Sequence, residues 1–110
     1  MSTVTPLTYQ ILLALADGDR HGYGIIKEIE ERAGVSAAPS TGALYLALQR
    51  MEGSGAITKC EQRPDHDDDA RRRYYRLTEA GRRLAEEESQ RMAALVRSAQ
   101  EKNLLAGGAA

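Results

Sequence analysis

The segment 40–55 restricts the possible folds more than any other part of the chain, because it has the apolar spacing of a short helix and a stop signal at each end. Pro39 disfavours helix at the residue before it, and Ser40 or Thr41 can supply the side-chain oxygen that caps a new helix. The apolar residues follow the i, i+4, i+7 spacing of one buried stripe: Leu44, Leu48 and Met51. Two glycines at the far end then stop the helix. The sequence therefore predicts an amphipathic helix, here called the reading helix, over residues 40–54.

The outer side of the reading helix carries side chains of the types that hydrogen-bond phosphates and base edges. They are Thr41, Tyr45, Gln49 and Arg50, with Ser40 at the start of the helix. A charged segment follows and ends, between Arg71 and Arg76, in four arginines without an acidic residue. A helix of this kind before a basic hairpin is typical of DNA-binding proteins, although an ordinary surface helix and a solvated run of charges could look the same.

Two more helices are predicted before the reading helix. Pro6 opens the first, which ends at the turn-forming residues 17–19. Leu13 adds a second apolar strip to it, and a helix that is apolar on two sides is normally covered on both. The second helix begins near His21, which we expect to cap it or to pack against the next element, and ends at Gly34. Its predicted buried residues are Tyr23, Ile26, Ile29 and Ala33.

A β-hairpin is predicted after the reading helix. Residues 57–62 are rich in β-formers, and a returning strand spans residues 72–78. The two-residue period of a strand puts Tyr75 and Leu77 on the core face. The opposite face is left for solvent or a ligand and carries Arg72, Tyr74 and Arg76. Between the strands, residues 63–70 form a polar tip that we expect to be mobile.

Thr78 can cap a long last helix over residues 79–105. Its apolar seam consists of Ala85, Met92, Leu95, Val96 and Ala99. At about 1.5 Å per residue this helix would be ~40 Å long, which is more than so small a domain can cover by itself. The simplest partner is a second copy of the chain, with Leu13 in the same interface. We expect a DNA-binding domain over residues 1–78, a dimerisation helix over 79–105 and a disordered tail over 106–110.

Composition limits the other classes of function. The chain has 110 residues and a net charge of −1. It has a single cysteine, Cys60, so an internal disulfide is excluded. No apolar run reaches the roughly 20 residues of a membrane helix, and the N-terminus lacks the order of a secretory signal, so we expect a cytoplasmic protein. The aspartates of residues 65–69 lack the glycine and distal glutamate of a calcium loop, and the glycines match no phosphate loop. The sequence therefore predicts no metal, no cofactor and no enzymatic activity.

Three motifs are similar to those of a known family. They are His21-Gly22-Tyr23-Gly24-Ile25, Ala43-Leu44-Tyr45 with Leu48-Gln49-Arg50-Met51-Glu52, and Arg73-Tyr74-Tyr75-Arg76-Leu77-Thr78-Glu79-Ala80-Gly81. In this order and spacing they resemble the PadR-like transcriptional regulators over residues 7 to about 100, and the short length resembles the compact members with a single C-terminal helix. The resemblance implies a mainly α fold with a small β-hairpin. This is a winged helix-turn-helix, with three helices and a two-stranded wing, followed by a long C-terminal dimerisation helix.

The resemblance also implies a homodimer that represses transcription from a near-palindromic operator and is often released by a small molecule. The reading helix would enter the major groove, where Gln49 could pair with an adenine edge and Arg50 would also touch DNA. Phosphates would be held by Ser40, Thr41 and Tyr45. From the wing, the neighbouring backbone would be contacted by Arg72, Tyr74 and Arg76. Two copies of the reading helix would then lie about 34 Å apart, which is one turn of DNA.

Some features depart from the family pattern. Leu46 lies opposite the buried stripe, where members often carry a polar, basic or proline residue, and it could touch a thymine methyl group. The wing tip carries four aspartates within residues 65–69, and carboxylates repel phosphate. A second hypothesis is therefore a winged-helix module that binds a protein through this acidic tip and has no specific DNA target. The chain has no Trp, no Phe and no Tyr beyond Tyr75, so its last helix offers no aromatic surface to a planar effector.

Overall fold

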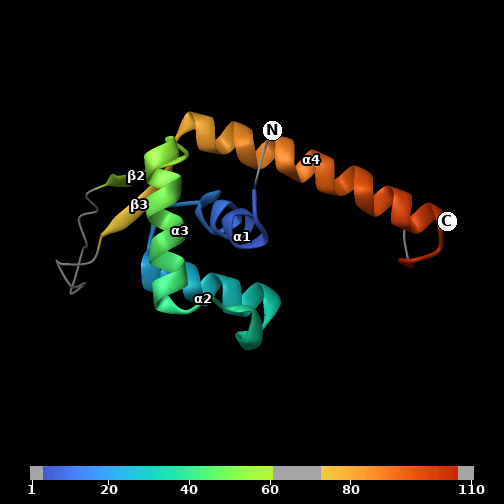
Figure 1. The fold of residues 1–110 in the computed structure, drawn as a ribbon, viewed down its shortest axis with the longest axis horizontal. Coiled ribbons are helices and arrows are strands. Elements are labelled where there is room, and N and C mark those ends of the chain that lie inside the picture. The colour runs from blue at the N-terminus through green and yellow to red at the C-terminus, as the bar shows by residue number, and fades with distance from the viewer. Residues whose placement is uncertain (1–3, 61–72, 107–110) are drawn as a thin grey trace.

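The computed structural model describes residues 4–60 and 73–106, which form several helices and a small antiparallel sheet at one edge of the molecule (Figure 1). In chain order the elements are α1 (Pro6–Leu15), β1 (Arg20–His21), α2 (Gly22–Ala33), the 3-10 helix η1 (Val35–Ala37), α3 (Thr41–Ser54), β2 (Ile57–Cys60), β3 (Tyr74–Leu77) and α4 (Glu79–Glu101). The mainly α class with a small wing is confirmed, and α3 is the reading helix. Arg72, the predicted mobile tip 63–70 with its acidic residues, and residues 107–110 of the predicted tail lie outside the described residues.

A side chain caps the N-terminal end of each α-helix that the structure describes. The acceptors are Thr5 Oγ1 in α1, His21 Nδ1 in α2, Ser40 Oγ in α3 and Thr78 Oγ1 in α4, each 3.0 to 3.1 Å from an amide nitrogen of the first turn. These bonds satisfy donors that have no partner within the helix. The caps predicted at His21 and Thr78 are confirmed, and Ser40 rather than Thr41 caps α3.

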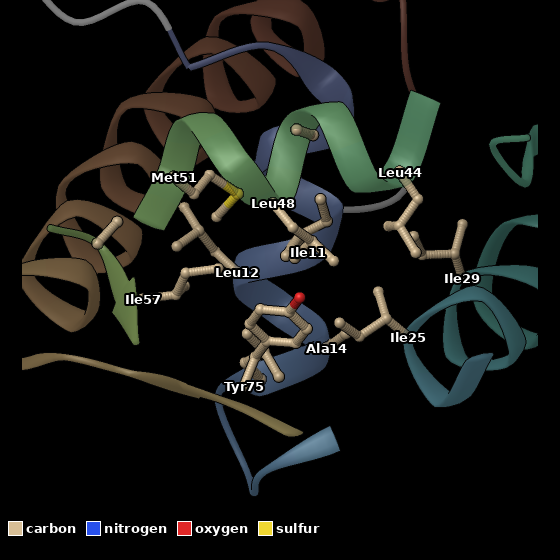
Figure 2. Packing of buried hydrophobic residues seen from close by; sticks show 13 residues of the cluster. Ile11, Leu12, Ala14, Ile25, Ile29, Leu44, Leu48, Met51, Ile57 and Tyr75 are labelled. Carbon is tan, nitrogen blue, oxygen red and sulfur yellow. The ribbon is translucent and has the colours of Figure 1, made fainter. Parts of the chain in front are cut away.

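One hydrophobic cluster lies between α1, α2, α3 and the sheet (Figure 2). Its larger members are Ile11, Leu12, Ile25, Ile29, Leu44, Leu48, Met51, Ile57 and Tyr75. The predicted stripe of α3 is therefore confirmed, because Leu44, Leu48 and Met51 are all at most 4% exposed. Burial of this stripe fixes the rotation of α3 about its own axis, and the opposite face is turned outward.

The sheet has three strands in the order β1-β3-β2, rather than the two predicted from the sequence. Arg20 pairs with Tyr75 and His21 with Tyr74 in β1–β3, whereas Ile57 pairs with Leu77 at the start of β2. The prediction missed β1 because two residues between a turn and a helix are too few to show a period. Its strand character comes from pairing with β3, which is remote in sequence. As predicted, the two strands of the wing place Tyr75 in the core, with Leu77 half-buried beside it.

The buried face of α2 differs from the prediction. Ile29 is buried as predicted and Ile26 is partly buried against the core, but Tyr23 is 58% exposed and Ala33 is exposed. The other buried residues of the helix are Gly22 and Ile25. The helix begins at Gly22, so its inward face is rotated by about one residue relative to the predicted one. Two adjacent isoleucines at positions 25 and 26 allowed either rotation, and in the structure Ile25 is the one that is fully buried in the core.

The first half of α4 packs on α1. Tyr9 Oη and Ser89 Oγ are 2.6 Å apart, and Arg82 Nη2 donates to the carbonyl of Ala16 at 2.6 Å. Ala85 is half-buried against the core, and Glu88 is buried with its carboxylate paired to Arg91. Beyond this region α4 extends away from the other elements (Figure 1). The second half of the helix therefore gains little stability from its own chain.

The C-terminal end of α4 lies at Glu101 and not near Leu105, as the apolar pattern had suggested. The chain turns just beyond it, where Asn103 has a φ of 63°, a left-handed conformation that does not continue a helix. Among the described residues, no helix has both the length and the apolar character needed to cross a membrane.

Thr78 joins the end of α3 to the start of α4. Its hydroxyl is 2.5 Å from the carbonyl oxygen of Gly55, the C-cap of α3, and 3.1 Å from that of Ala56. The Thr78 amide also donates to the Ala56 carbonyl, at 3.0 Å. The same hydroxyl oxygen accepts the Gly81 amide of α4. This group of contacts, here called the Thr78 junction, fixes where α4 starts relative to α3.

Candidate nucleic-acid interface

The outer face of α3 presents every residue that the sequence predicted there. Ser40, Thr41, Tyr45, Gln49 and Arg50 are all exposed, and Leu46 is 59% exposed among them. Arg50 has no ion pair with a described residue, so its guanidinium is available to an anion. Because the buried stripe anchors the other side of the helix, this face is rigid and accessible at once, which is what a helix needs to enter the major groove.

The strands β2 and β3, here called the wing base, contribute fewer free groups than predicted. Tyr74 is half-buried, and its ring meets that of His21 edge-on with centroids 5.1 Å apart. Arg76 is exposed, but its Nη2 is 2.8 Å and its Nε 3.2 Å from the carboxylate of Asp19. Arg73 is exposed and was not singled out from the sequence. The predicted contact residues Tyr74 and Arg76 are therefore both engaged within the chain.

Asp19 also lies against the only cysteine of the chain. Cys60 Sγ is 3.6 Å from Asp19 Oδ2. The hydrogen bond from Arg76 lowers the pKa of Asp19, and the same bond raises the pKa of Arg76, so both groups are charged at neutral pH. Burial raises the pKa of Cys60, and the Asp19 carboxylate raises it further. A thiol with a raised pKa is mostly protonated at neutral pH and reacts slowly.

We expect Asp19→Asn to increase the rate at which Cys60 reacts with an alkylating reagent by a few-fold at mildly alkaline pH. Without the carboxylate the pKa of Cys60 falls, so the reactive thiolate forms at lower pH and the whole rate profile moves in that direction. The measurement is the alkylation rate across a pH series. Asp17→Asn is the matched control, because Asp17 pairs with Arg20 instead. An Asp19→Asn profile that coincides with the control would contradict the contact.

The described residues show no cluster of side chains that suggests a bound metal ion. They contain no group of three or more His, Cys, Asp or Glu side chains placed to hold a metal ion. Several of their other charges are paired with one another, since Glu28 forms ion pairs with both Arg20 and Arg32. The outer face of α3 combines exposed hydrogen-bonding side chains with the exposed guanidinium of Arg50, and Arg73 is exposed beside the wing base.

A winged helix-turn-helix whose reading helix presents such a face defines a DNA-binding transcriptional regulator. Residues 11–87 match the model of the Transcriptional regulator PadR-like family. The match covers most of the chain, so the chain belongs to this family, and the resemblance seen in its motifs is confirmed. The prediction of a regulator rather than an enzyme is confirmed with it.

Solved structures share this fold. A PadR family transcription regulator from hypervirulent Clostridium difficile matches with a TM-score of 0.76 and 28% identity, over 88% of this chain and 97% of that one. Bacillus subtilis PadR in complex with operator DNA matches in fold, with a TM-score of 0.63 and 24% identity, over 76% of this chain and 46% of that one.

Curated relatives are larger than the part that they share with this chain. An uncharacterized 37.1 kDa protein in transposon TN4556 of Streptomyces fradiae is 41% identical over 85 residues, which are 77% of this chain and 22% of that protein. For a second relative the matched part is 64% of its length. The chain thus spans less than two thirds of either protein.

Three residues at this surface were missed or not used by the sequence analysis. Asp19 was assigned only to a turn, and nothing local could reveal its pairing with an arginine that lies 57 residues further along the chain. Arg73 was noted only as part of a run. Gly22 was noted only as part of a motif, although it is buried beneath Tyr45.

Proposed function

We propose that this chain is a homodimeric repressor that binds a near-palindromic operator with α3 in the major groove. The observation that carries the proposal is the outer face of α3, where Thr41, Tyr45, Gln49 and Arg50 are all exposed while Leu44 and the rest of the stripe hold the helix in the core. The fold is shared with Bacillus subtilis PadR, a protein solved in complex with operator DNA. Such a regulator must meet chromosomal DNA, and we place it in the cytoplasm for that reason.

In this proposal each residue of α3 has a separate task. The Gln49 amide pairs with an adenine edge, and the Arg50 guanidinium binds a phosphate or a guanine. Ser40, Thr41 and Tyr45 contact the backbone. Exposed Leu46 suits a thymine methyl group. The wing base adds phosphate contacts through Arg72, Tyr74 and Arg76, and for Arg76 the DNA must share or replace the carboxylate of Asp19.

The second half of α4 supports the proposed dimer. Leu95 is 57% exposed and Val96 43% exposed, on a part of the helix that extends beyond the core. Met92 and Ala99 lie half-buried on the same seam, as does Leu13 on α1. Ala85 also belongs to the proposed interface, although its packing against its own core leaves it less surface for a partner. We assign residues 1–78 to DNA binding and residues 79–105 to dimerisation.

Repression would follow from occupation of the operator by this dimer. A small molecule that binds between the subunits would change the separation of the two α3 helices and release the DNA. The seam carries aliphatic side chains, so an aliphatic effector suits it better than a planar aromatic one.

The test of this function starts from DNA recovered from a random-sequence pool by the wild-type chain. We expect Gln49→Ala to weaken binding to the recovered sequence by about 1–3 kcal/mol and to relax the preference at one base pair of each half-site. Gln90→Ala, at an exposed glutamine on α4, is the control and should bind as the wild type does. The measurement is a titration monitored by fluorescence anisotropy. Failure of the wild-type chain to enrich any sequence would overturn the proposal.

A further inference from the structure

The first residue of α2 lies directly against the side chain of Tyr45. Gly22 is buried, and a Cβ added to it would be 2.1 Å from Tyr45 Oη and 2.7 Å from Tyr45 Cζ, well inside van der Waals contact. The φ of Gly22 is not among the positive values found at Gly18, Gly34 and Gly55, so its backbone would suit any residue. The absence of a side chain at Gly22 therefore matters because it leaves space for the Tyr45 ring.

Both backbones at this contact are held in place. The α2 side is fixed because His21 caps the helix through the Gly24 amide at 3.0 Å and pairs with Tyr74 in the sheet. The α3 side is fixed by Leu44 and Leu48, which are at most 1% exposed. The three atoms nearest to an added methyl group at Gly22 all belong to the far end of the Tyr45 side chain. That side chain is 45% exposed and can rotate into solvent.

We propose that Gly22 is a positioning residue for DNA recognition, because it lets the Tyr45 ring lie across the start of α2 in one fixed orientation. The inference rests on the proposed DNA contact of Tyr45. An aromatic side chain that is already ordered loses little conformational freedom when it binds, so holding it increases affinity without adding a contact. Gly22 acts through Tyr45 and does not itself touch DNA.

The experiment is a double-mutant cycle with the full chain and the duplex selected by the wild type. Gly22→Ala should weaken binding by about five- to tenfold, and Tyr45→Ala should weaken it at least as much. In the Tyr45→Ala background, Gly22→Ala should have no further effect, because the methyl group then has nothing to displace. Gly53→Ala is the matched control, since a Cβ at this position of α3 meets nothing within 4 Å. The Tm of each variant shows whether the fold is intact.

The outcomes separate the inference from the function on which it rests. If Tyr45→Ala binds as the wild type does, the proposed Tyr45 contact is wrong, and the role of Gly22 is wrong with it. If Tyr45→Ala is weak but Gly22→Ala is not, the contact stands and the positioning role is overturned. If Gly22→Ala is equally damaging with and without Tyr45, or if it lowers the Tm in both backgrounds, Gly22 is merely structural. Loss of affinity confined to the Tyr45 background supports the proposal.

Discussion

Gly81→Ala is expected to lower the Tm by about 4–12 °C, since overpacking costs about 1–3 kcal/mol and each kcal/mol shifts the Tm of a domain of this size by about 4 °C. A Cβ on Gly81 would be 2.0 Å from the carbonyl oxygen of Ala56 and 3.1 Å from Leu77 Cδ2. Unlike the tyrosine hydroxyl beside Gly22, the obstacle here is backbone. It cannot move without breaking the bonds that Ala56 accepts from Thr78.

The measurement is thermal unfolding monitored by circular dichroism. Gly53→Ala tests the same substitution in open space and should instead leave the Tm unchanged or raise it slightly, because Gly53 lies in the last turn of α3 and alanine favours helix over glycine. A Gly81→Ala variant that melts with or above this control would show that α4 does not start against Ala56.

Leu95→Glu should convert the proposed dimer into a monomer and lower the affinity for a two-half-site operator by about 100-fold or more, because linked binding sites gain that much from acting together. Leu95 is 57% exposed on the projecting half of α4, so the substitution should leave the fold of the chain intact. Its carboxylate would be buried without a partner only if two copies meet at this seam.

Sedimentation measurements give the mass in solution, and titration of the selected duplex gives the affinity. Gln90→Glu adds the same charge at an exposed position on another side of α4, so it should remain dimeric. A wild-type chain that sediments as a monomer at micromolar concentration, or a Leu95→Glu variant that remains dimeric, would contradict the proposed interface.

The parts of the fold that could be predicted depend on signals within a few residues. The reading helix was predicted correctly because Ser40 caps its start and the stripe of Leu44, Leu48 and Met51 lies within it. Thr78 likewise marked the start of α4. Each signal is either an N-cap residue or the regular spacing of apolar residues along a helix, and both follow from local backbone geometry.

The parts that could not be predicted depend on contacts between distant segments. The strand β1 exists only through pairing with β3, and the inward face of α2 is set by the packing of Ile25 and Ile29 in the shared core. The engagement of Arg76 required Asp19, which is placed beside it by the turn before β1. On α3, the residues predicted to face outward are exposed, and their contacts with DNA stay a prediction. The sequence could not show that Arg76 is already paired.

The Thr78 junction has a mechanical consequence for any dimer built through α4. Because one hydroxyl links the Gly55 and Ala56 carbonyls to the first turn of α4, the two helices change their relative angle only if these bonds break. In a dimer, each α3 would then move with its own α4 as one rigid body. Any adjustment to operators with different half-site spacing would have to come from sliding or bending where the two long helices cross.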